Sequence, residues 1–196
     1  MVKSFKCKDT KELFETEKTR RFVNIRTTAL RKLLLLSEAR QIGDLRSPGN
    51  NLEALKGDRE DNIRFGSTIN SGFASNGMRR RTMRTTSKSS TTTKRDRHLE
   101  VIEGLHPGRT ILEDYLQPLE MSVNALAKEL GVTAARLNEI VRGKRAMSAD
   151  TALRLARHFG TTAEFWMGLQ SAYEIRRARY EAGKKIEKEV RPREAT

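Results

Sequence analysis

Apolar residues recur at helical spacing in the first third of this 196-residue chain and again in its second half, but not between them. In the first third, "TKELFETEKT" (10–19) predicts a helix capped by Asp9, and "IRTTALRKLLLLSEA" (25–39) predicts a second one. "LEALKGDRE" (52–60) then predicts a strand and a turn. Two helices and one strand cannot close a core by themselves. The pattern therefore predicts that residues 1–65 expose their apolar stripes and are loose or aggregation-prone.

The middle of the chain, residues 66–97, has neither a helical nor a strand period. Serine, threonine, glycine and arginine replace the large apolar residues that a core requires. Such a composition cannot bury enough apolar surface to offset the entropy of ordering. We predict a disordered basic linker here.

Helical signals return from about Leu99 onward and predict five short helices. Connections of two to six residues between helices are typical of a compact all-α domain. We place this domain at residues 98–178 and a charged C-terminal tail at 179–196. The predicted helix N-caps are Thr110, Ser122, Thr133, Ser148 and Thr162, and the predicted helix ends are Gly131, Gly143 and Gly160.

Charge and composition limit the classes of function. The formal net charge is +14, of which residues 1–65 contribute +5, residues 66–97 contribute +7 and residues 98–196 contribute +2. Because half of the excess lies in the predicted linker, overall basicity is weak evidence for nucleic-acid binding. The single cysteine, Cys7, excludes an intramolecular disulfide.

Other features argue against a metal site and a membrane segment. The three histidines stand apart without a cysteine partner, so no metal site is expected. The longest apolar run, residues 33–36, is too short to span a bilayer, and the N-terminus does not resemble a signal peptide. We expect a cytoplasmic protein.

The stretch from Ser122 to Arg145 fits the demands of a helix-turn-helix. Ala127 is small where the second helix must cross, and Gly131 suits the left-handed turn between the helices. An ordinary helical hairpin is the alternative. The apolar seam that would hold the two helices together comprises Leu126, Leu130, Val132, Leu137 and Ile140.

If this unit binds DNA, its second helix presents its first residues to the major groove. Arg136 would then pair with guanine and Asn138 with adenine, while Thr133 and Ala134 would meet thymine methyl groups. For the arginines, the alternative is a solvated surface charge. The predicted contacts to the DNA backbone follow the second helix and are Arg142, Lys144 and Arg145.

Two phrases, "HPGRTILEDYL" and "EFWMGLQ", together with the helix-turn-helix residues, make residues 99–196 resemble the HigA-type antitoxins of the Cro/C1-like helix-turn-helix family. The resemblance implies a homodimer that binds double-stranded operator DNA in its own promoter and also binds a HigB-type toxin. It implies no catalytic residue, no cofactor and no small-molecule substrate. The apolar face of Phe165, Trp166, Leu169 and Tyr173 would belong either to the domain's own core or to a dimer seam.

The N-terminal segment has a resemblance of its own. "MVKSFKCKDTKELFETEKTRRF" and "NNLEALKGDRE" resemble the HigB-type toxins, ribosome-associated mRNA-cleaving proteins of the α+β RelE-like fold. The later strands of that fold and its terminal Asp-Tyr-His are absent. A shifted reading frame of codons for Ser87–Lys94 can encode Glu-Ile-Val-Asp-Tyr-His and a stop. We hypothesise that a frameshift near Ile63–Gly66 destroyed the toxin's sheet, which leaves residues 1–65 as a two-helix remnant.

The sequence thus predicts a mainly α protein that represses its own toxin–antitoxin promoter. One alternative is a fusion that retains ribosome-dependent mRNA endonuclease activity, which inhibition of translation by residues 1–97 would reveal. Another is a basic protein that binds nucleic acid without sequence preference. Competition with non-specific DNA at rising salt separates this last class, because a sequence reader keeps a sequence-dependent margin.

Overall fold

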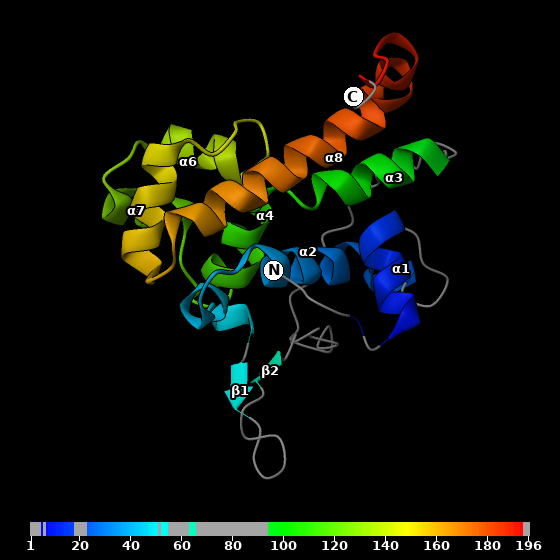
Figure 1. The fold of residues 1–196 in the computed structure, drawn as a ribbon. Coiled ribbons are helices and arrows are strands. Elements are labelled where there is room, and N and C mark those ends of the chain that lie inside the picture. Colours follow the sequence, from blue (N-terminus) through cyan, green and yellow to red (C-terminus); the bar gives the residue numbers. More distant parts are fainter. Residues whose placement is uncertain are drawn as a thin grey trace, which may run out of the picture.

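The structure, a computed structural model, describes residues 5, 7–17, 23–50, 52–54, 63–65 and 94–193 (Figure 1). Residues 66–93, which make up most of the predicted linker, lie outside the described residues. The described part is mainly α, as the sequence predicts. The elements of the N-terminal half are α1 (Lys8–Thr16), η1 (Val23–Ile25), α2 (Arg26–Glu38), η2 (Ile42–Leu45), η3 (Pro48–Asn50), β1 (Leu52–Ala54) and β2 (Ile63–Phe65).

The two short strands pair antiparallel, with Glu53 opposite Arg64. The strand predicted at the start of 52–60 is therefore present. The described C-terminal half contains the five predicted helices, and α3 (Lys94–Glu103) and α4 (Pro107–Thr110) precede them. The five are η4 (Ile111–Leu116, a π-helix), α5 (Val123–Leu130), α6 (Ala134–Val141), α7 (Ala149–Phe159) and α8 (Ala163–Glu189).

Four helices of the C-terminal half begin at the predicted caps. The hydroxyl oxygens of Ser122, Thr133, Ser148 and Thr162 each accept a hydrogen bond from the backbone N–H three residues on. Each bond satisfies one of the N–H groups that a helix start leaves without a partner. These helix starts are fixed by local chemistry, which explains why they could be predicted from the sequence.

Two other predicted caps are wrong. Thr110 directly precedes η4, but its hydroxyl makes no capping hydrogen bond, because Pro107 opens the helix one turn earlier and His106 caps it, its Nδ1 accepting the N–H of Gly108 at 3.0 Å. Asp9 lies inside the first turn of α1, where the N-cap position is held by Cys7 without a side-chain hydrogen bond.

A helix crosses each of the two predicted boundaries of the C-terminal domain. Helix α3 begins at Lys94, so residues 94–97, which we assigned to the linker, are helical. The charged tail from 179 continues α8 as far as Glu189. Pairs of opposite charge four residues apart, Arg177–Glu181 and Lys185–Glu189, support this exposed helix.

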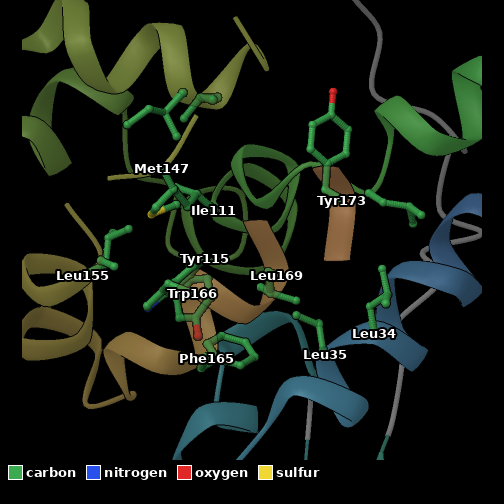
Figure 2. Close-up of a cluster of buried hydrophobic side chains, with 14 of the residues drawn as sticks. Leu34, Leu35, Ile111, Tyr115, Met147, Leu155, Phe165, Trp166, Leu169 and Tyr173 are labelled. Atoms are coloured by element: carbon green, nitrogen blue, oxygen red, sulfur yellow. The ribbon is translucent and has the colours of Figure 1, made fainter. Parts of the chain in front are cut away.

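An aromatic cluster fills the middle of the C-terminal half. Tyr115 lies 5.6 Å from Trp166 and 4.2 Å from Phe159 between ring centroids, and Trp166 donates its indole N–H to Thr161 Oγ1 at 2.8 Å (Figure 2). The face of α8 predicted to form either core or a dimer seam belongs to this core. Phe165, Trp166, Leu169 and Tyr173 are all 5% exposed or less within one chain, which excludes the seam.

The prediction that residues 1–65 expose their apolar stripes is wrong for the described helices. Leu13 of α1 and Leu30, Leu34 and Leu35 of α2 are each 1% exposed or less. Helix α2 lies beside α8 (Figure 1), and Leu35 lies next to Leu169 and Phe165 (Figure 2). The C-terminal half thus supplies the apolar surface that we expected only a sheet to supply.

We expect Gly108→Ala to lower the free energy of unfolding by about 1–3 kcal/mol, the usual cost of overpacking a core. A Cβ at Gly108 would meet the backbone carbonyl of Ile140, so α4 and α6 would have to separate. Gly183→Ala is the matched control, since a Cβ there meets only Arg179 Cγ at 3.5 Å. In the exposed part of α8 this change should stabilise by about 0.5–1 kcal/mol. Urea denaturation measures both, and equal effects would contradict the close approach.

Candidate nucleic-acid interface

Helices α5 and α6 pack against each other through the predicted seam. Leu126, Ala127, Leu130, Leu137 and Ile140 are buried, and Val132 is partly buried against the same cluster. Gly131 joins the helices with a φ of +64°, in the left-handed region that favours glycine. The sequence positions that we assigned to the helix-turn-helix thus form one bihelical unit.

The start of α6 presents its first side chains to solvent. Thr133 and Ala134 are exposed at this end. The Thr133 hydroxyl oxygen accepts the N–H of Arg136 at 3.3 Å, which leaves its methyl group and its O–H donor available to a ligand. Exposed side chains at the start of the second helix are the requirement for reading base edges in the major groove.

Arg136 follows them but is held by α7. One guanidinium nitrogen donates to Ser148 Oγ at 2.6 Å and to Thr151 Oγ1 at 2.7 Å, and it lies 3.1 Å from Asp150 Oδ2. Its side chain is 30% exposed. Reaching a guanine would require this nitrogen to exchange its partners, so base reading by Arg136 stays a prediction.

Asn138 is held less tightly. Its amide donates to the carbonyl of Ala134 at 2.9 Å and to Asn124 Oδ1 at 3.2 Å. The partner Asn124 is exposed on α5, so the bond between the two side chains lies at the surface. Adenine recognition by Asn138 would replace that bond and likewise stays a prediction.

The loop after α6 carries the three residues predicted to contact phosphates. Arg142 and Lys144 are exposed, and neither makes an ion pair or a side-chain hydrogen bond with the described residues. Arg145 pairs with Glu139 at 2.6 Å, with both side chains about half exposed. Such surface pairs contribute about 0–1 kcal/mol, so a phosphate can replace the carboxylate at low cost.

The buried ring of His106 packs against this loop, a role that we did not predict from the sequence. The ring is 3% exposed, packs edge-on against Tyr173 at 4.9 Å and lies under Gly143. Burial lowers the pKa of His106 to about 4, although a hydrogen bond to the Arg145 backbone opposes that shift. A neutral imidazole therefore joins the start of α4 to the loop. The available signal was a side chain with an acceptor directly before Pro107.

Arg154 connects α7 to α5, a contact that we did not predict from the sequence. It donates to the carbonyl of Leu130, at the end of α5, at 2.8 Å. It also pairs with Asp150 at 3.1 Å. Hydrogen bonding from Arg154 and, to a lesser extent, the charge of Arg136 lower the pKa of Asp150. The base of the bihelical unit is thus fixed by an exposed ion network on α7.

No group of three metal-ligating side chains occurs among the described residues. None of the helices in the described part of the chain is long and apolar enough to cross a bilayer.

A helix-turn-helix family model matches residues 112–166. Virulence-associated protein I of Dichelobacter nodosus is 50% identical over 74 residues, which cover 38% of this chain and 68% of that protein. A solved addiction-module antidote protein of the HigA family from Coxiella burnetii is 51% identical, covering 45% of this chain and 96% of that one, with a TM-score of 0.44.

A further solved structure contains nucleic acid. It is the Pseudomonas aeruginosa antitoxin HigA with the higBA promoter, 46% identical to this chain. The match covers 44% of this chain and 95% of that one, with a TM-score of 0.44. These three relatives match less than half of this chain each.

Proposed function

This chain belongs to the HigA family of helix-turn-helix antitoxins, and from that membership we propose that it is a sequence-specific DNA-binding antitoxin of a type II toxin–antitoxin module. It binds operator DNA in its own promoter and represses transcription. The observation that carries the proposal is the exposed start of α6 beside the exposed cations of the loop that follows it. Mobility shift of the gene's own upstream region tests the proposal, and failure to bind it more tightly than unrelated DNA would refute it.

The roles of the side chains follow from their positions. Thr133, Ala134, Arg136 and Asn138 read bases, which requires Arg136 to exchange its partners on α7. The loop binds phosphates and fixes the register of the protein on the duplex. The residues of the loop that take this role are Arg142, Lys144 and Arg145.

The remaining parts of the proposal concern partners and origin. The protein acts in the cytoplasm as a homodimer, binds a HigB-type toxin and has no catalytic activity of its own. Residues 1–65 descend from such a toxin, whose sheet a frameshift near Ile63–Gly66 destroyed. The nucleotide sequence tests this origin: a shifted frame without toxin-type strands would refute it.

Substituting a base-reading arginine and substituting a phosphate-binding arginine should change DNA binding in different ways. We expect Arg136→Ala to reduce discrimination between operator and unrelated DNA by about 1–3 kcal/mol. We expect Arg142→Ala to weaken binding to all sequences alike and to reduce the salt slope by about one. Titrations at several salt concentrations measure both, with Arg191→Ala beyond the end of α8 as the control. Identical loss patterns from the two variants would contradict the division of roles.

A further inference from the structure

Residues 23–50, hereafter the docked segment, are charge-matched to the C-terminal half. Lys32 Nζ lies 2.5 Å from Asp114 Oδ1, and an Arg31 guanidinium nitrogen lies 2.5 Å from Glu113 Oε2. Arg31, Lys32 and Asp114 are all less than 10% exposed. The buried carboxylate of Asp114 is paired with two bases that come from more than 80 residues earlier in the chain. Such complementarity is characteristic of specific protein interfaces.

A second polar contact joins the docked segment to the C-terminal half, and here the docked segment supplies the acid. Asp44, 1% exposed, accepts hydrogen bonds from the backbone N–H of Thr162 at 2.6 Å and from its hydroxyl at 3.1 Å. Thr162 is the N-cap of α8, so the carboxylate lies at the positive end of that helix. The docked segment therefore presents bases to acids at η4 and an acid to the start of α8.

Glycines allow close approach at both ends of the contact, to a side chain at one end and to the backbone at the other. A Cβ at Gly168 of α8 would collide with the carboxylate of Glu38. A Cβ at Gly49 of the docked segment would lie 3.0 Å from Asp114 Cα. Between these points Leu35 packs beside Leu169 (Figure 2). Apolar packing, paired charges and close backbone approach together define a built interface, which we call the docking face: Glu113, Asp114, Thr162, Phe165, Gly168 and Leu169.

We propose that the docking face is the toxin-binding surface of this antitoxin and that the docked segment occupies it in cis. Without the docked segment, the docking face would bind a separate polypeptide that presents the same helix and loop. That polypeptide would carry an Arg-Lys pair, a buried Leu-Leu pair and an aspartate that caps α8. The inference rests on the toxin partner of the proposed function, since the docked segment lies between the two stretches, residues 1–22 and 50–60, that resemble that toxin. A tethered ligand acts at an effective concentration of about millimolar, so a free competitor is excluded.

A labelled peptide of residues 23–50, added to the full chain, tests this occupancy. Lys32→Glu places two acids together at Asp114 and should release the docked segment. We expect this variant chain to bind the peptide at least about 100-fold more tightly than the parent chain does. Adding Asp114→Lys to that variant restores the pairing in cis and should abolish capture of the peptide. Lys11→Glu is the control on α1, where Lys11 faces only Glu15 at the surface.

A second measurement does not depend on peptide folding. A protease site inserted after Gly77 allows the full chain to be cut, and we expect the two fragments of the parent to co-elute and those of Lys32→Glu to separate. Fragments of the parent that separate would overturn the proposal. So would a Lys32→Glu chain that binds operator DNA normally but captures the peptide no better than the parent.

The two proposals fail in different ways. If the parent chain does not bind its operator, the repressor function falls while the peptide result still decides the occupancy. If the operator is bound and the parent chain captures the peptide as tightly as Lys32→Glu does, the docking face is open and only the occupancy falls.

Discussion

Replacing Asp114 with Asn is expected to lower the free energy of unfolding by about 3–5 kcal/mol, the usual cost of removing one partner from a buried ion pair. Asp114 Oδ1 lies 2.5 Å from Lys32 Nζ, and its Oδ2 lies 3.5 Å from Arg31 Nε. Burial lowers the pKa of Lys32, and the negative charge of Asp114 is the main influence that opposes this shift. Without it, Lys32 keeps the neutral oxygens of Asn50 and Gly49 as hydrogen-bond partners, and the charge of Glu113 offsets its burial only to a lesser extent.

Urea denaturation followed by the fluorescence of Trp166, the single tryptophan, measures this loss in the core next to the contact. Asp150→Asn is the matched control. Asp150 also pairs with two arginines, Arg136 and Arg154, but its side chain is 53% exposed. Solvent screening should make the effect of this control much smaller than that of Asp114→Asn. Equal losses from the two variants would show that burial is not what makes Asp114 important.

The features that could be predicted from the sequence are those specified within a few residues. A hydroxyl before an apolar run specifies a helix start, as at Ser148, and a glycine after such a run specifies its end, as at Gly131. The seam of the bihelical unit follows from a period of 3.6. These signals need no knowledge of the rest of the chain, and the described helices of the C-terminal half follow them closely.

The docking of residues 23–50 could not be predicted in this way, because its partners are far apart in sequence. Arg31 and Lys32 are charged residues in a helix and are expected to face solvent. Their burial depends on Glu113 and Asp114, which sit in a π-helix that local periodicity does not indicate. Exposed apolar stripes were predicted for the same reason, since the covering surface belongs to another part of the chain.

In the candidate site, too, features specified locally could be predicted and features that depend on tertiary contacts could not. Position on a helix indicated correctly that Thr133 and Ala134 are accessible. It gave no indication that Arg136 would donate to Ser148 and Thr151, since α7 reaches α6 only through the tertiary fold. DNA binding by this side chain therefore competes with contacts inside the protein, a cost that sequence reasoning leaves out.

Acidification from pH 6.5 to pH 4 is expected to remove about 3 kcal/mol of stability through His106 alone. The pKa of this histidine is about 4 in the folded chain against an ordinary value of 6.5, and each pH unit between the two is worth about 1.4 kcal/mol. Between these pH values the unfolded chain binds the extra proton and the folded chain does not. Stability is therefore complete above pH 6.5 and is lost as the pH falls toward 4.

The difference between the parent and His106→Asn isolates this contribution from the carboxylates that titrate nearby. Asparagine keeps an acceptor for the N–H of Gly108 and is a favourable N-cap, but it does not titrate. We expect the variant to lose some packing against Tyr173 at pH 7.5 and to show a flatter fall in stability below pH 6.5. His98→Asn is the control, since the His98 side chain is 27% exposed and, among the described residues, forms an ion pair with Glu17 alone. Parallel pH profiles of the parent and His106→Asn would contradict a buried neutral imidazole. The loop that carries Arg142 to Arg145 would then owe its position to contacts other than His106.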